Sequence, residues 1–472
     1  MAEKKKTEKK EESYNLPASW QSAWKISAGV GLLGLAGAGF GMTQDATRFA
    51  HSYLFAFYVF LTIALGSLFF VLIQRLTSAH WSVTVRRTAE FFASGLPLFA
   101  ILFLPILLQM NSLFPWLGHG GHEGGGHHGQ VSLIVGEAHA QEHAAPPVAA
   151  DPHAPAAAAK APPAAHGGNA AAPAHAQAGG NDAHAVEHAA LMERKSPYLN
   201  RSFFLVRAVA YFAIWTILGI NFFNFSTKQD KTKDAQLTLK AQRWAPPSTF
   251  LFAFSLTFAA FDWMMSLDPT WFSTIYGVYV FATSVVSSLA LIIVVTMALR
   301  DSGPLKDVVT VEHYHDLGKL LFGFNVFWAY IGFSQMMLIW YAALPEETPF
   351  YHRRWDFGPW AGVSMTVLFG HFVTPFLFLI SRNIKRRLPL LRIGAAWMLL
   401  MHVVDMYWFV MPNFTYTAGL DPDSFNFSWV DGACLLGVGG VYLGFVFWQM
   451  TKHPLIPIGD PRLARSLHFV NA

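Results

Sequence analysis

The sequence predicts an all-α integral membrane protein with about ten transmembrane helices. Its 472 residues are 53% hydrophobic and only 13% charged, whereas soluble domains carry about 25% charged residues. Ten apolar segments are long enough, at about 20 residues each, to cross a bilayer. Lys and Arg residues also concentrate on alternate connections between these segments. Together these observations exclude a soluble globular domain.

The ten segments fall in two blocks, with three in residues 23–110 and seven in residues 198–450. They cover approximately residues 23–41, 51–73, 88–110, 199–225, 248–267, 270–299, 319–343, 358–380, 390–411 and 429–449. Little more than Asp268 and Pro269 separates the fifth segment from the sixth, which predicts a tight hairpin. Glycines in residues 29–41 have small-xxx-small spacing, which favours close helix packing over phosphate binding.

The distribution of basic residues predicts the orientation of the chain. With the N-terminus in the cytoplasm, 25 of the 33 Lys and Arg residues fall on cytoplasmic segments and the other 8 on the opposite side. The positive-inside rule therefore places both termini in the cytoplasm. Residues 1–22 form a charged cytoplasmic tail rather than a signal peptide, and residues 451–472 form a second cytoplasmic tail.

Residues 111–197 form an insert of a different composition, rich in His, Ala, Pro and Gly. Eleven of the chain's 20 histidines lie between His119 and His188, yet the segment has almost no apolar residues with which to build a core. We expect a mostly disordered periplasmic loop. It either captures Zn, Cu or Ni loosely or is a solvated insert with no specific role, and we favour the second interpretation.

The sequence offers no means of holding a redox centre covalently. Cys434 is the only cysteine, so the chain has no internal disulfide, no CxxCH haem attachment and no cysteine-bound iron–sulfur cluster. The sequence has no GxGxxG motif after a predicted strand, no Walker motif and no HExxH metal motif. If electrons cross this protein, the cofactor is held in another way or belongs to a partner.

Ionisable residues within the apolar segments are the main functional candidates, because each is costly in a bilayer unless it is accommodated. From the helix rise, we expect Asp262 and Asp405 to lie in the periplasmic third, with Arg207 at a similar depth. His371 and His402 fall near the midplane. Asp262 acts either in proton handling or as the partner of Arg207 in a structural ion pair.

His402 and Asp405 are three residues apart, which places them on one helix face, and Trp408 extends the same face. Such a pair can relay a proton or polarise a quinone oxygen. The alternative is a packing pair that satisfies itself, and we favour function for the two residues together. For His371 alone, a functional group and a satisfied bundle histidine are equally acceptable interpretations.

A hydroxyl stripe follows one face of the sixth segment at spacings of 3, 4 and 4 residues: Tyr276, Tyr279, Thr283 and Ser287. The stripe either holds a file of water or bonds to the helix backbone, which is the commoner case.

Polar residues also occur where two segments begin on the cytoplasmic side. Glu90 opens the third segment, and Asp316 is expected at the cap or first turn of the seventh. Asp316 and Glu312 either satisfy this helix start or, with His313 and His315, collect protons at the surface.

Three stretches resemble the NrfD/polysulfide-reductase family of membrane subunits, in particular the ActF-type subunits of bacterial alternative complex III. They are "FDWMMSLDPTWFSTIYGVY", "HDLGKLLFGFNVFWAYIGFSQMMLIWYAALPEET" and "HVVDMYWFVMP". The resemblance covers roughly residues 199–450, and residues 20–110 more weakly.

This resemblance implies two four-helix bundles plus two further helices in a bacterial inner membrane. It implies a respiratory or photosynthetic quinol:cytochrome c oxidoreductase whose iron–sulfur clusters and c-type haems reside in partner subunits. Those partners include a sibling NrfD-like subunit, an iron–sulfur subunit, multihaem and monohaem cytochromes c and, in some assemblies, a terminal oxidase. The chain itself would contribute a proton path or a cavity for quinone or lipid. A proton-coupled transporter and a structural anchor for a periplasmic redox complex remain alternatives.

Overall fold

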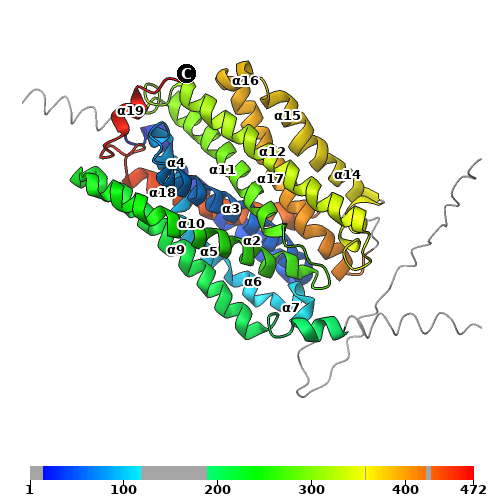
Figure 1. Ribbon diagram of the computed structural model, residues 1–472. Coiled ribbons are helices and arrows are strands. Elements are labelled where there is room, and N and C mark those ends of the chain that lie inside the picture. Colours follow the sequence, from blue (N-terminus) through cyan, green and yellow to red (C-terminus); the bar gives the residue numbers. More distant parts are fainter. Residues whose placement is uncertain (1–13, 118–188, 357, 421–426, 472) are drawn as a thin grey trace, which may run out of the picture. The chain divides into compact units, whose positions relative to one another are not determined.

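The computed structural model describes residues 14–117, 189–356, 358–420 and 427–471. Every regular element in these ranges is helical (Figure 1). Ten helical segments within them are long and apolar enough to cross a membrane, which confirms the prediction of an all-α integral membrane protein with about ten spans. Residues 122–193 form a separate unit of which only residues 189–193 are described, so most of the His-rich insert lies outside the described residues.

The spanning elements are α2 (Ala23–Gln44), α3 (Ala46–Leu76), the series α4 (Val83–Ala93), α5 (Leu96–Leu102) and α6 (Leu104–Leu108), then α9 (Arg201–Thr232), α10 (Ala235–Trp263), α11 (Tyr276–Asp301), α12 (Val311–Ala342), the series α14 (Gly358–Thr366), η4 (Val367–Val373) and α15 (Thr374–Leu379), then α17 (Leu388–Thr417) and α18 (Trp429–Lys452).

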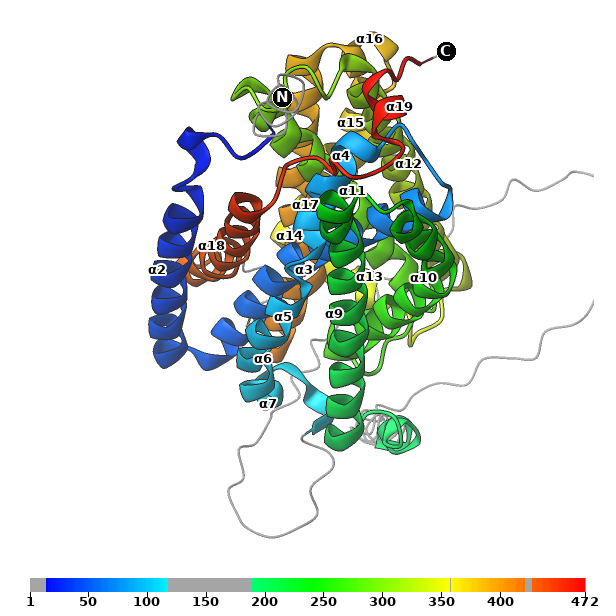
Figure 2. The same ribbon diagram turned by 90° about the vertical axis from the view of Figure 1, so that its left-hand side faces the viewer.

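Eight of these spans pack as two groups of four, and the first and last spans form a pair. The first group contains α3, α4–α6, α9 and α10, and the second contains α11, α12, α14–α15 with η4, and α17. The two groups meet where α3 packs against α11, and α2 and α18 pack together against α3 (Figures 1 and 2). This arrangement is that of two four-helix bundles plus two further helices.

Small residues explain the close contact between α2 and α18. A Cβ atom at Gly31 would meet the backbone of Gly440 and Val441, and one at Gly34 would meet the backbone of Gly437. In lipid the hydrophobic effect does not drive two helices together, because the acyl chains are as apolar as the side chains. Dispersion between the closely packed backbones stabilises the contact instead. The prediction that glycines in residues 29–41 serve helix packing is confirmed.

Two expected connections differ from the structure. Residues 226–247 were expected to be a cytoplasmic loop, but α9 and α10 continue through them and only residues 233–234 separate the helices. Lys233 takes a left-handed conformation that ends α9, and the Asp234 side chain accepts from the amide of Gln236 to begin α10. Both helices continue here as polar sequence beyond their apolar parts, and hydropathy does not predict helix in polar sequence.

The expected hairpin at Asp268 and Pro269 is also looser than predicted. Helix α10 already ends at Trp263 and α11 begins at Tyr276, with the short 3₁₀ turn η3 (Met265–Leu267) and residues 268–275 between them. Asp268 forms an ion pair with Arg353 at 2.7 Å, and the Trp271 ring stacks on Phe350 with centroids 4.0 Å apart. The apolar side chain of Trp271 therefore packs against the short helix α13 (Pro349–Trp355) and does not extend a spanning helix.

Candidate functional site

The Asp405 carboxylate is the centre of a buried polar cluster in the second four-helix group. It is fully buried and accepts from Thr283 Oγ1 at 2.8 Å, Tyr279 OH at 3.3 Å and Trp328 Nε1 at 3.3 Å. These donors come from α11 and α12, so the carboxylate of α17 joins three helices. No Lys, Arg or His in the described part of the chain forms an ion pair with it. All its partners are neutral.

His402 joins this cluster to the first four-helix group. Its Nδ1 lies 3.2 Å from Thr283 Oγ1, and its Nε2 lies 3.0 Å from Thr62 Oγ1 and 3.1 Å from the carbonyl of Val59. The predicted shared face of His402 and Asp405 is present, but the two side chains meet through the Thr283 hydroxyl. That hydroxyl gives Asp405 and His402 a common hydrogen-bonding partner.

The hydrogen-bond directions permit two protonation states of this cluster. Thr62 Oγ1 also lies 2.6 Å from the carbonyl of Tyr58, to which it donates. Oxygen atoms that can accept therefore face both ring nitrogens of His402. The cluster can hold a proton on the Asp405 carboxyl beside a neutral imidazole. The geometry also permits the proton on the imidazole beside a carboxylate, with the Thr283 hydroxyl between the two groups.

His371 lies beside this cluster. It belongs to the π-helical turn η4, and its ring stacks on Trp328 with centroids 3.9 Å apart. Neither ring nitrogen has a partner in the described part of the chain, and the same holds for both side-chain polar atoms of Asn325, one turn from Trp328 on α12. Buried polar atoms of this kind are commonly satisfied by ordered water. π-Helical turns are frequent at functional sites.

Asp262 has a different environment from Asp405. Arg207 donates to it from Nε at 2.7 Å and Nη2 at 3.0 Å, and Tyr211 OH donates at 2.7 Å. The Arg207 guanidinium also lies over the rings of Tyr198 and Phe203, at 3.9 Å and 4.3 Å from their centroids. The carboxylate therefore has a charged, bidentate partner. This geometry favours the structural ion pair over proton handling at Asp262.

The ends of the two helices that carry these aspartates agree only in part with the expected spans. Asp262 was expected about five residues before the end of its span, and the candidate span Ala235–Leu267 ends five residues after it. The span of Asp405 was expected to end near residue 411, but α17 continues to Thr417, so His402 and Asp405 both lie near the middle of the helix. Pro412 does not stop α17, because Arg354 donates to the carbonyl of Trp408 that the proline leaves without a partner.

The hydroxyl stripe divides into two parts. Tyr279 and Thr283 both contact Asp405. Ser287 donates to the carbonyl of Ser284, and the Tyr276 ring packs against Phe409. Only the middle of the stripe therefore belongs to the site.

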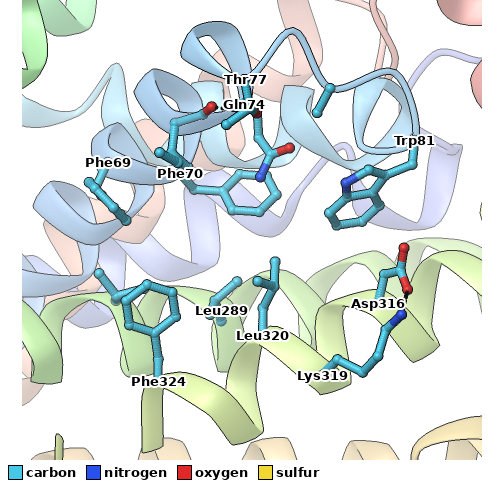
Figure 3. Close-up of a pocket in the computed structure, with 13 residues that line it drawn as sticks. Phe69, Phe70, Gln74, Thr77, Trp81, Leu289, Asp316, Lys319, Leu320 and Phe324 are labelled. Atoms are coloured by element: carbon cyan, nitrogen blue, oxygen red, sulfur yellow. Dashed lines mark hydrogen bonds and ion pairs between the residues drawn. The ribbon is translucent and has the colours of Figure 1, made fainter. Parts of the chain in front are cut away.

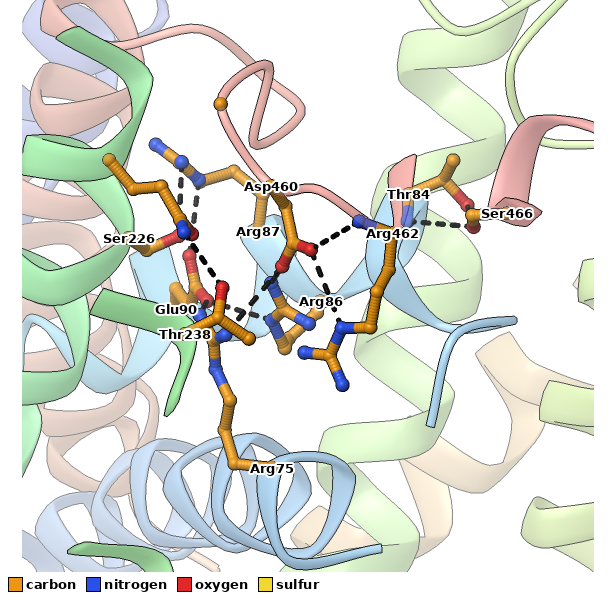
Figure 4. A network of polar contacts seen from close by, with 12 residues as sticks. Arg75, Thr84, Arg86, Arg87, Glu90, Ser226, Thr238, Asp460, Arg462 and Ser466 are labelled. Carbon is orange, nitrogen blue, oxygen red and sulfur yellow. Dashed lines mark hydrogen bonds and ion pairs between the residues drawn. The ribbon is translucent and has the colours of Figure 1, made fainter. Parts of the chain in front are cut away.

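Glu90 lies in a buried network of charges that also includes Asp460 of the C-terminal segment (Figure 4). Arg86 lies 3.0 Å from Glu90 and 2.7 Å from Asp460, and Arg75 lies 3.6 Å from each of the same two acids. Arg87 lies 2.6 Å from Asp230. Burial opposes ionisation of Asp460, but the charges of Arg86 and Arg75 outweigh it and hold the pKa of that carboxyl well below its usual range. Glu90 therefore stands among fixed charges, within the third span rather than at its start.

The other expected surface groups lie around Asn471 of the C-terminal tail. Glu312 accepts from Arg386 at 2.8 Å and 2.5 Å, His315 lies 3.5 Å from Asn471, and Asp316 pairs with Lys319 at 2.5 Å. The expectation that Asp316 caps the seventh span is wrong, because α12 begins at Val311 and Thr310 caps it together with the His313 side chain. Asn471 donates to the Glu312 carbonyl at 3.2 Å and lies 3.5 Å from His315 Nδ1 and 3.4 Å from Lys319 Nζ. Three of the four groups therefore share one neighbourhood, while His313 caps the helix.

Sequence reasoning missed Thr62, Trp328 and Asn325, as well as the partners of Glu90. The hydroxyl and indole groups are ordinary residues in apolar helices and give no signal singly. The two arginines Arg86 and Arg87, four and three residues before Glu90, are a signal of helical ion pairs that could have been read. Asp460 is distant in sequence and could not have been found.

Among the residues that the structure describes, no group of three or more His, Cys, Asp or Glu side chains is arranged to hold a metal ion. No known protein-family model matches the chain, and no curated protein matches it. The resemblance noted from the sequence therefore stays a prediction.

Proposed function

We propose that this all-α membrane protein moves protons through the Asp405 cluster as a subunit of a quinol-oxidising electron-transfer complex. The observation that carries the proposal is a fully buried carboxylate with only neutral hydrogen-bond donors around it. An ionised carboxylate without a counter-charge is costly in a membrane, and a proton is the simplest partner that removes the charge. His402 and Thr283 provide the acceptor and the bridge for that proton.

The contrast with the other buried acids supports this assignment. Asp262, Asp431 and Asp460 each pair with an arginine. Arginine does not release its proton in proteins, so these pairs keep a fixed charge. Asp405 alone among these four acids has surroundings in which gaining and losing a proton are both feasible.

The complex we propose is of the alternative complex III type, with this chain as its ActF-type subunit in the bacterial inner membrane, both termini in the cytoplasm. The redox centres, iron–sulfur clusters and c-type haems, would belong to the iron–sulfur, multihaem and monohaem subunits. Two groups of four spans plus the pair α2 and α18 support this assignment, as do the sequence stretches that suggested it. A sibling NrfD-like subunit would be the principal quinol site, and a terminal oxidase an additional partner.

One observation favours the alternative of a proton-coupled transporter. The third and eighth spans are both interrupted, the third between α4, α5 and α6 and the eighth at η4, and proline begins α5, α6 and α15. Interrupted helices in two halves of a protein are typical of transporter binding sites. Purification of the native assembly discriminates the alternatives, because c-type haem that co-purifies cannot be attached to a chain without a CxxCH motif.

The sharpest test of the proton bridge is a matched pair of variants, Thr283→Val and Thr283→Ser. Valine keeps the shape of threonine but removes the hydroxyl between Asp405 and His402, whereas serine keeps that hydroxyl. In the intact complex, we expect Thr283→Val to lower proton-coupled quinol:cytochrome turnover by about 10²-fold, as for loss of a positioned proton-transfer group. Thr283→Ser should remain within about threefold of the wild type.

Asp405→Asn and His402→Gln complete the test, with the exposed Asp301→Asn as control. We expect assembled complexes in all three, with turnover and proton release impaired most in Asp405→Asn and less in His402→Gln. Normal turnover with normal proton release in Asp405→Asn would refute the proposed relay. Failure of both to assemble would support a structural role for the cluster instead.

A further inference from the structure

A pocket of about 350 Å³ lies between α3, α11 and α12, away from the Asp405 cluster (Figure 3). Its walls come from the end of α3, the beginning of α12 and the middle of α11. Lys319, which lines the pocket, lies 3.4 Å from Asn471, so this end of the pocket lies beside the C-terminal tail.

The pocket has one apolar end and one polar end. Phe69, Phe324 and Leu289 line the apolar end, while Asp316 and Lys319 lie at the other (Figure 3). Along α12, eight residues separate Asp316 from Phe324, which corresponds to about 12 Å of helix. A molecule that extends from the membrane surface into the hydrocarbon region over this length matches the pocket. A phospholipid has that form.

The polar end is electrically neutral and contains an unsatisfied acceptor. Asp316 Oδ1 and Lys319 Nζ are 2.5 Å apart and form an ion pair of zero net charge. Gln74 is only 6% exposed, and its Oε1 has no hydrogen-bond partner within the described residues. An unmatched buried acceptor is costly, so a ligand that donates a hydrogen bond at this point stabilises the pocket.

We propose that this pocket binds a phospholipid with a primary ammonium headgroup, of the phosphatidylethanolamine class. The ammonium donates to Gln74 Oε1 and Asp316, the phosphate faces Lys319, and one acyl chain lies along Phe69 and Phe324. Phosphatidylcholine has the same charges but no N–H to donate. Phosphatidylglycerol brings a net negative charge toward Asp316 and no cation in exchange. Headgroup chemistry therefore selects among lipids that share the same chains.

The test uses the purified native assembly, stripped of lipid and supplied separately with the three lipids on identical acyl chains. Lipid retained after washing is measured by mass spectrometry, and thermal stability is measured in parallel. We expect phosphatidylethanolamine to be retained about tenfold more tightly than phosphatidylcholine, the effect of a charge-assisted hydrogen bond. Equal retention of both lipids, or retention of a quinone in their place, would overturn the proposal.

Gln74→Leu should abolish this preference while leaving the ion pair in place. Lys319→Gln provides a second variant at a half-exposed position, where folding is not at risk, and should weaken retention of all phosphate lipids. Gln236→Leu, at an exposed position near the same end, is the matched control and should bind as the wild type does. A preference for phosphatidylethanolamine that survives in Gln74→Leu would contradict the assignment of Gln74 as the acceptor.

Discussion

The same substitution at the two buried aspartates should lower stability by different amounts. Asp262→Asn removes the charge that Arg207 Nε and Nη2 contact at 2.7 Å and 3.0 Å, and leaves a guanidinium that is only 8% exposed without its counter-ion. Breaking a buried pair in this way costs about 3–5 kcal/mol. Contacts of Arg207 with the Tyr198 carbonyl and ring remain, so we expect the lower end of that range.

Asp405→Asn should cost much less, because every partner of Asp405 is neutral. The asparagine oxygen still accepts a hydrogen bond, and the Thr283 hydroxyl can turn to accept from the new amide. We expect a loss of about 1 kcal/mol, the usual contribution of one neutral hydrogen bond.

Thermal unfolding of the purified variants in one detergent separates the two cases. At about 2 °C per kcal/mol, Asp262→Asn should lower the melting temperature by about 6 °C and Asp405→Asn by about 2 °C. The double variant Arg207→Met with Asp262→Asn should be more stable than either single variant, because it leaves no charge without a partner. Equal losses in the two Asp→Asn variants would refute the distinction between a paired and an unpaired carboxylate.

Three further predictions concern the pH dependence of stability, the packing of two helices and the orientation of the chain in the membrane. The folded state holds the pKa of Asp460 below its unfolded value, so the ionised carboxylate stabilises the protein fully above about pH 4 and less as the pH falls further. Asp460→Asn should therefore lose less stability than the wild-type protein between pH 6 and pH 3. Gly66→Ala should destabilise the protein by about 1–3 kcal/mol in denaturation, because its Cβ would collide with the carbonyl of Ser284 on α11. With Cys434 replaced by Ser, a membrane-impermeant thiol reagent should label Glu346→Cys in intact cells but Ser302→Cys only in inverted vesicles; the reverse pattern would contradict the predicted orientation.

The fold could be predicted from sequence because the bilayer constrains it strongly. Backbone polar groups must be satisfied within each span, so ten apolar segments imply ten helices. The errors occur where that constraint ends: α9 and α10 continue into polar sequence, and residues 270–275, with Trp271, Phe272 and Ile275 among them, are not helical. High hydropathy indicates that a segment is buried in lipid or in protein. It does not show whether that segment is a spanning helix or a non-helical connection that packs against another element.

The site could be predicted only in part. His402 and Asp405 share a helix, so their spacing fixes their relative position. Thr62 is 340 residues from His402 along the chain, and Trp328 is 77 residues from Asp405. Contacts of this kind depend on which helices pack together and on their rotation, and one sequence determines neither by periodicity. The partner that decides the interpretation of Asp262, Arg207, was foreseen because it is the only basic residue within the fourth apolar segment at a matching depth.

The arrangement of charges in the bundle gives the proton proposal its physical basis. Arginines fix the acids at the ends of the spans: Arg86 holds Asp460 at one end, and Arg207 holds Asp262 at the other. These ion pairs can hold the helices in register around the Asp405 cluster for which we propose proton transfer. Asp405 lies midway along α17, and neutral donors from two other helices orient its carboxylate. None of these donors carries a positive charge that would hold the carboxylate ionised. A lysine or arginine at the position of Trp328 would fix that charge and convert the site into a third structural pair.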